Sequence, residues 1–175
     1  MLDKLKDITT FVFDVDGVLT NGNILVAENG EQLRQYNIKD GYAIQLAIKK
    51  GYEVAVITGA KTEAVNLRLK GLGVKHIYLN ASYKMPLFLD FLEKTGKQKS
   101  EIVYCGDDLP DQEIMEQVAI AVCPSDGVQE IKDICNYISP FNGGAGVARD
   151  IIEKVLKVQN NWFVEKPNAD DGAIK

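Results

Sequence analysis

Two carboxylates stand two positions apart directly after a short apolar run. Phe11-Val12-Phe13 leads into Asp14 and Asp16, and Gly17 follows them. Residues at this spacing face the same side of a strand, and like charges about 4 Å apart repel by roughly 4 kcal/mol at an effective dielectric of 20. Either one carboxyl is therefore protonated beside a nucleophile, or a divalent cation lies against both. Mg²⁺ suits such a site, because it binds through one or two carboxylates together with a phosphate.

A second acidic cluster follows another apolar run. Ile102-Val103-Tyr104 precedes Gly106 and the carboxylates of Asp107, Asp108 and Asp111. Pro110 within this cluster is typical of a helix start, and one of the aspartates could cap that helix. Capping accounts for one of the acids and not for all three.

A hydroxyl and a cation lie between the two acidic clusters in the chain. Thr58-Gly59 closes the apolar run Val54 to Ile57, and Lys84 precedes a helix predicted to begin near Met85. Taken alone, the first is an ordinary strand-to-helix turn and the second a solvated surface lysine. Together they could hold phosphoryl oxygens, the lysine also neutralising the first aspartate.

The elements that must position these residues alternate between strand and helix, which is typical of the α/β fold class with a parallel sheet covered on both faces. Strands are predicted at Thr10 to Asp14, Glu53 to Thr58, His76 to Leu79, Glu101 to Gly106, Ala119 to Cys123 and Tyr137 to Ser139. Helical periodicity is found at Tyr42 to Lys50, Glu63 to Leu72, Met85 to Lys94, Gln112 to Val118 and Gly146 to Val158. Most of the acids, the hydroxyl and the lysine therefore follow successive strands.

One segment interrupts the alternation. Ile24 to Tyr36 predicts two short strands around Asn29-Gly30, a strong hairpin signal. We expect this flap, at about 23–36, to follow the first strand at the sheet edge where ligands bind in open α/β sheets. The chain is predicted to form one domain over 1–160, with a polar and mobile tail over 161–175.

The composition limits the class of protein. The 175 residues carry a formal charge of −5 and no basic block, so nucleic acid is not expected as a partner. Without an apolar stretch of about 18 residues, a soluble cytoplasmic protein is expected. The three cysteines, Cys105, Cys123 and Cys135, form no CxxC pair and are interpreted as reduced and structural.

The order of these motifs resembles that of the haloacid-dehalogenase superfamily of phosphohydrolases. The stretches DVDGVLT, TG at 58–59, Lys84 and GDDLPD at 106–111 match its four motifs. The resemblance implies the following roles: Asp14 is the nucleophile; Asp16 is the general acid and base; Thr58, Gly59 and Lys84 bind the phosphoryl group; Asp14, Asp107 and the main-chain carbonyl of Asp16 bind Mg²⁺; Asp108 and Asp111 support these ligands.

The resemblance narrows to a capless branch of this superfamily. Only about 40 residues separate Asp14 from Thr58, which leaves room for a hairpin and a helix but no cap domain. The branch contains the 3-deoxy-D-manno-octulosonate 8-phosphate phosphatases, tetrameric enzymes of lipopolysaccharide sugar synthesis. The stretches NIKDGYAIQLA, TGAKTEAVNLRLKGLGV and GGAGVARD resemble this branch over about Ile8 to Val158. A sugar-acid phosphate as substrate, and a homotetramer in which a neighbouring subunit closes the site, are the expectations that follow.

Two positions depart from the branch. Many members carry arginine where this chain has Ala60 and Ala145. Related phosphatases of nine-carbon, sialic-acid-type sugar acids carry glutamate at the first position, which is absent too. Substrates with eight or nine carbons both stay open. Arg68 and Arg149 are candidates for binding a substrate carboxylate, or they form surface ion pairs.

Two non-enzymatic classes of protein share some of these features. Receiver domains also hold a phosphoryl group with aspartates, a threonine and a lysine, but they carry an acidic pair rather than DxD after the first strand. An inactive relative acting as a binding subunit would not need all four motifs. A magnesium-dependent phosphatase is therefore the main prediction.

Overall fold

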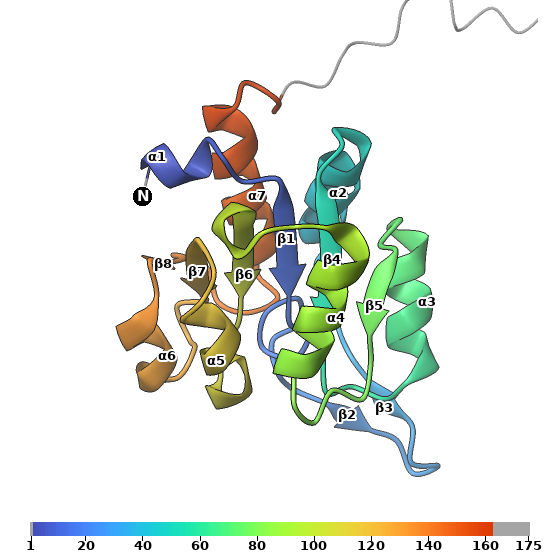
Figure 1. Cartoon of the computed structure of the whole chain (residues 1–175). Coiled ribbons are helices and arrows are strands. Elements are labelled where there is room, and N and C mark those ends of the chain that lie inside the picture. The colour runs from blue at the N-terminus through green and yellow to red at the C-terminus, as the bar shows by residue number, and fades with distance from the viewer. Residues whose placement is uncertain (1, 163–175) are drawn as a thin grey trace, which may run out of the picture.

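A parallel sheet forms the centre of the computed structural model, which describes residues 2–162 (Figure 1). Within these residues the sheet has six strands in the order β5-β4-β1-β6-β7-β8. The strands are β1 (Thr10–Phe13), β4 (Glu53–Ile57), β5 (His76–Tyr78), β6 (Ile102–Cys105), β7 (Ile120–Cys123) and β8 (Tyr137–Ile138). Each lies inside a segment predicted as a strand, so the predicted α/β class is confirmed.

Helices precede, connect and follow the strands. They are α1 (Leu2–Leu5), α2 (Ile38–Lys49), α3 (Glu63–Gly71), α4 (Met85–Thr95), α5 (Gln112–Met115), α6 (Gln129–Ile134) and α7 (Val147–Val158), with short 3₁₀ turns η1 (Lys99–Glu101) and η2 (Leu109–Asp111). Helix α2 begins earlier than predicted, because the side chain of Asn37 caps it by accepting the N–H of Lys39. Helices α1 and α6 were not predicted, because helices of 4 and 6 residues are too short to show a helical period in the sequence.

The two faces of the sheet bury separate cores. Phe11 and Phe13 of β1 pack on one side, in a cluster with residues of α2 and α7. Val12, between them in the chain, points to the other side and packs with Phe88 and Phe91 of α4. The central strands are buried on both faces, as expected for a parallel sheet.

A hairpin leaves the carboxyl edge of the sheet. Strands β2 (Leu25–Val26) and β3 (Gln32–Leu33) pair antiparallel, and the flap extends beyond that edge (Figure 1). Asn29-Gly30 lies in its turn, where Gly30 adopts a φ of +84°. Between β1 and β4, the described residues form only this hairpin and α2 as regular elements. The prediction of a flap without a cap domain is confirmed.

Other sequence predictions are met in part. Within residues 2–162, no helix combines the length and apolar character that crossing a bilayer requires. The three cysteines are free. The tail predicted to be mobile falls outside the described residues from 163 onward, so the domain boundary stays a prediction.

Candidate active site

Three of the predicted site residues come from neighbouring strands at one level. Phe13 of β1 is in register with Val56 of β4 and Cys105 of β6. Asp14 lies one residue beyond this level, and Thr58 and Asp107 each lie two residues beyond it. Strand β1 is also where the chain order of the sheet reverses, the place at which open α/β sheets bind ligands.

These residues line one cleft of about 340 Å³. All the predicted nucleophilic, acid–base, phosphate-binding, metal-binding and supporting residues are among its walls, which are Asp14, Asp16, Thr58, Gly59, Ala81, Ser82, Lys84, Asp107, Asp108, Pro110 and Asp111. The motifs that lie far apart in the sequence therefore meet in space, as predicted.

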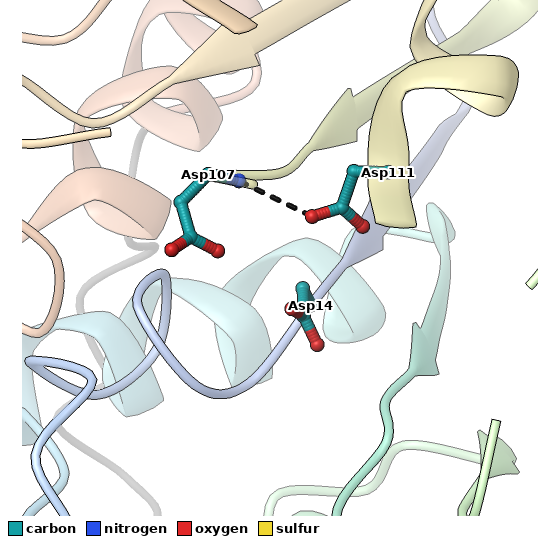
Figure 2. A group of neighbouring side chains, drawn as sticks. All are labelled: Asp14, Asp107 and Asp111. Carbon is teal, nitrogen blue, oxygen red and sulfur yellow. Dashed lines mark hydrogen bonds between the residues drawn. The ribbon is translucent and has the colours of Figure 1, made fainter. Parts of the chain in front are cut away.

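Lys84 is buried between two carboxylates. Its Nζ lies 2.9 Å from Asp14 Oδ2 and 2.7 Å from Asp111 Oδ1. The hydroxyl of Tyr104 donates to the same Asp111 oxygen at 2.7 Å, and the main-chain N–H of Asp107 donates to Asp111 Oδ2 (Figure 2). Both oxygens of Asp111 are thus engaged, so this residue holds Lys84 and supports the loop of Asp107.

The one lysine of the site does not balance the negative charge of Asp14 and Asp107. Burial, together with the charge of Asp111, raises the pKa of Asp14 to about 6, although Lys84 opposes the shift. Burial, then the charge of Asp14, raises the pKa of Asp107 to about 7. Oδ1 of Asp107 is buried and has no hydrogen-bond partner among the described residues. An anionic site with an unused oxygen is what a divalent cation requires.

The residues present fit Mg²⁺. Asp14, Asp107 and Asp111 each offer a carboxylate oxygen, and these oxygens lie within 4.8 Å of one another. Figure 2 shows that the three side chains are neighbours although they follow different elements. Asp111 is engaged by Lys84 and Tyr104, and Asp14 pairs with Lys84 through Oδ2 and accepts the N–H of Val15 through Oδ1. Asp107, whose Oδ1 has no partner among the described residues, therefore has the most capacity for an ion, and Asp14 lies within reach of the same ion.

Two glycines allow the loops to approach this closely. Gly17 has a φ of +90°, and a Cβ there would lie 2.0 Å from Asp107 Oδ2. A Cβ on Gly143 would lie 2.0 Å from the carbonyl oxygen of Gly17. At position 17 only glycine combines a positive φ with the absence of a Cβ that would clash with Asp107. The loop after β1 is therefore held between Asp107 and the glycine-rich segment before α7.

Thr58 and Asp108 have distinct local roles. The Thr58 hydroxyl oxygen accepts the N–H of Ala60 at 3.2 Å, so its hydrogen is available to a phosphoryl oxygen. Asp108 is exposed and accepts the N–H of Leu109 at 2.7 Å. It is thus the aspartate that caps the short turn containing Pro110, as one of the sequence alternatives proposed.

Asp16 carries a partner that sequence reasoning missed. Arg34, directly after β3, donates from Nε and Nη2 to the two carboxylate oxygens at 2.7 and 2.9 Å. Asp16 and Arg34 also line a second cleft of about 760 Å³ between the flap and the start of α3, together with Ala60 and Lys61. The only available signal was the position of Arg34 on the predicted flap.

The two candidate carboxylate-binding arginines do not line the Asp14 cleft. Arg149 forms an ion pair with Glu153 and lies over the ring of Trp162. Arg68 lies over the ring of Tyr36, and its buried Nε has no partner among the described residues. Arg149 therefore forms the surface ion pair that was its alternative, and a substrate role for either arginine stays a prediction.

Comparisons with known proteins agree with this geometry. Residues 77–151 match the model of a family described as haloacid dehalogenase-like hydrolase. The 3-deoxy-D-manno-octulosonate 8-phosphate phosphatase of Salmonella typhi is 36% identical over 159 residues, 91% of this chain and 85% of that protein.

Solved structures of proteins with the same name are also similar to this chain. The chain superposes with a TM-score of 0.89 on the Yersinia pestis phosphatase of that name, at 31% identity over 91% of this chain and 86% of the other. The Moraxella catarrhalis enzyme, solved with a magnesium ion, a phosphate ion and 3-deoxy-D-manno-octulosonate (KDO), gives 0.89 at 32% identity over 92% of each chain.

Proposed function

The chain belongs to the haloacid dehalogenase-like hydrolases, in the family of KDO 8-phosphate phosphatases, and from this membership we propose that it hydrolyses KDO 8-phosphate to KDO and phosphate with Mg²⁺. The observation that carries the proposal is the buried Lys84, which ties Asp14 to the Asp111 support within a cleft that also holds Asp16, Thr58 and Asp107. A binding subunit or a signalling switch would not need an acid–base residue beside the phosphoryl acceptor.

The chemistry follows from the placement of the side chains. A carboxylate oxygen of Asp14 attacks phosphorus, so an O–P bond to Asp14 forms while the bond to the sugar oxygen breaks. Asp16 gives its proton to the departing sugar oxygen, then takes a proton from the water that hydrolyses the aspartyl-phosphate. Thr58, the N–H groups of the Gly59 loop and Lys84 orient the phosphoryl oxygens and balance their charge.

Mg²⁺ belongs with two of these carboxylates. Asp14, Asp107 and the main-chain carbonyl of Asp16 would hold the ion, with Asp111 and Asp108 supporting the loop. When bound, the ion supplies positive charge that neutralises the phosphoryl group. Asp107 Oδ1, buried without a partner among the described residues, is the oxygen with most to gain.

A nine-carbon sugar-acid 9-phosphate is the second candidate substrate. Ala60 lines the 760 Å³ cleft beside the flap, where many KDO 8-phosphate phosphatases carry arginine. Ala145 lines a different cavity of about 380 Å³ near the start of α7. Since Arg34 is paired with Asp16, the small side chain at position 60 leaves Lys61 as the other cation that lines the cleft, and a lysine suits either sugar acid.

Assembly into a homotetramer is part of the same proposal. Leu25 and Val26 of the flap are 68% and 63% exposed, and exposed apolar side chains beside a site are typical of an interaction surface. A neighbouring subunit docked there would exclude water from the uncapped cleft. A role in lipopolysaccharide synthesis is a further part of the proposal. So is a cytoplasmic location, because free cysteines are typical of a reducing compartment.

The test is a substrate panel with a nucleophile variant. Wild-type protein with MgCl₂ is expected to release phosphate from KDO 8-phosphate with the highest kcat/KM of the panel, which includes nine-carbon sugar-acid phosphates. Asp14→Asn is expected to abolish turnover and keep the circular dichroism spectrum, because the amide is not a nucleophile. Asp90→Asn, at an exposed ion pair with Lys94, is the matched control. Substantial activity in Asp14→Asn would overturn the mechanism, and preference for a nine-carbon substrate would overturn the substrate.

A further inference from the structure

The flap reaches the acid–base residue through one side chain. Arg34 follows β3 directly and grips both oxygens of Asp16 in a two-point contact, at 2.7 and 2.9 Å. Its side chain is only 4% exposed, while that of Asp16 is 30% exposed. A planar guanidinium paired with both oxygens fixes the rotation of a carboxylate as well as its position.

Little else orients Asp16. Among the described residues, the one other side chain within hydrogen-bond reach is the hydroxyl of Thr20, at 3.4 Å, which is near the limit for a hydrogen bond. Nη1 of Arg34 is buried without a partner in the same part of the chain. The guanidinium is therefore held mainly by Asp16, and the direction of the Asp16 carboxylate depends on Arg34.

Asp16 lies where two clefts meet. It lines the 340 Å³ cleft of Asp14 and Lys84 and also the 760 Å³ cleft of the flap. If a substrate has its phosphoryl group in the first cleft and its sugar in the second, the P–O bond that breaks lies beside Asp16. Arg34 lines only the second of these clefts and approaches Asp16 from the sugar side.

We propose that Arg34 is a positioning residue: one of its two contacts opens when Asp16 takes up the proton that it donates, and the other keeps the carboxyl group directed at the leaving oxygen, so that the aim of the general acid depends on the position of the flap. This inference rests on the proposed function, in which Asp16 protonates that oxygen. Leu25 and Val26 of the flap are exposed, so a contact there that moves the flap would also move Arg34.

The test compares leaving groups. A sugar oxygen leaves poorly without a proton, whereas p-nitrophenolate leaves without one. In single-turnover rapid-quench experiments, Arg34→Gln is expected to slow phosphoryl transfer from the sugar phosphate by about 10- to 100-fold, which is part of the rate that general acid catalysis usually contributes. Transfer from p-nitrophenyl phosphate is expected to slow by less than about threefold. Arg34→Lys keeps the charge without the two-point contact and is expected to fall between wild type and Arg34→Gln. Gln35→Ala, the adjacent exposed flap residue, is the matched control.

A double-mutant cycle completes the test. If Arg34 acts through Asp16, Arg34→Gln adds no further loss to Asp16→Asn. Equal losses for both substrates, additive losses in the cycle, or a change confined to KM would each overturn the inference. The sugar phosphate used is whichever member of the panel the wild type hydrolyses, so failure of KDO 8-phosphate would overturn the substrate proposal and not the role of Arg34.

Discussion

At the residue scale, Lys84 is the buried cation that partly neutralises the carboxylates of the site. It is one buried cation beside Asp14 and Asp111, with Asp107 close by. A buried charge pair is costly to break, because the remaining partner is left without compensation. The site as folded therefore holds more negative than positive charge and is prepared for a cation that arrives with the substrate or before it.

This excess charge predicts how pH and Mg²⁺ act on stability. The folded-state pKa values of Asp14 and Asp107, about 6 and about 7, lie above the ordinary value of 3.8. The folded protein then binds more protons than the unfolded chain between about pH 4 and 7, so without metal its stability falls as pH rises through that window. Mg²⁺ competes with these protons, and we expect MgCl₂ to raise the Tm more at pH 8 than at pH 5.

Asp107→Asn is the variant that checks this cause. It removes one titrating group, so the metal-free Tm should fall less with pH and the Tm increase caused by MgCl₂ should shrink. Asp40, whose pKa burial also raises to about 6, titrates in the same window in both proteins and cancels in the comparison. Thermal melts with EDTA or MgCl₂ provide the measurement, and an equal Mg²⁺ effect at both pH values would contradict it.

The site residues differ in how far the sequence predicted them. Asp14 and Asp107 were predicted because each follows an apolar strand, and parallel strands place their carboxyl ends together. Tyr104 looked like another core residue of its strand, and its hydroxyl contact with Asp111 depends on packing. Arg34 reaches Asp16 across 18 positions, a distance at which no periodicity reports a contact.

At the scale of elements, the site depends on loops that pack closely because glycines occupy the points of contact. The loop after β1 lies between Asp107, which follows β6, and Gly143, which precedes α7. Asp40 of α2 strengthens this arrangement by accepting the N–H of Arg149 in the first turn of α7 at 2.8 Å. Helices α2 and α7 therefore hold the glycine segment against the catalytic loop.

Gly17→Ala tests this stacking. The new Cβ would lie 2.0 Å from Asp107 Oδ2 at a φ of +90°, so Asp107 must move. We expect kcat/KM to fall by about 10- to 100-fold, as when a metal ligand loses its support, and the Tm increase caused by MgCl₂ to be lost. Gly51→Ala is the control: its φ is +89° with nothing within 4 Å of the new Cβ, so it loses about 1–2 kcal/mol of stability and keeps its activity. Full activity in Gly17→Ala would contradict the close approach.

The elements show why the sheet was easier to predict than its edges. Apolar runs such as Val54 to Ile57 are fully buried, and their pattern is visible in the sequence. The flap strands are only two residues long and exposed, so their bounds were predicted too widely. Helix α6 contributes Ile131 to the core but is too short to show a period.

At the scale of the whole molecule, the uncapped cleft has one covering element of its own. The flap places Arg34 on the inside, while Leu25 and Val26 are 68% and 63% exposed. Apolar side chains gain about 1.5–3 kcal/mol each when fully buried, and a symmetric assembly would repeat that gain in every copy. The structure of one chain therefore leaves a surface that a second copy can use.

Leu25→Glu tests whether that surface holds subunits together. A charged side chain loses the burial of leucine in every copy and is costly to bury unpaired. We expect the wild type to sediment as a tetramer and Leu25→Glu as smaller species, with kcat/KM for the sugar phosphate lowered because the cleft is no longer closed. Leu89→Glu, at a leucine of α4 that is 48% exposed, is the matched control and should stay tetrameric and active. A monomeric wild type with full activity would refute closure by a neighbour and leave the flap as the cover of its own site.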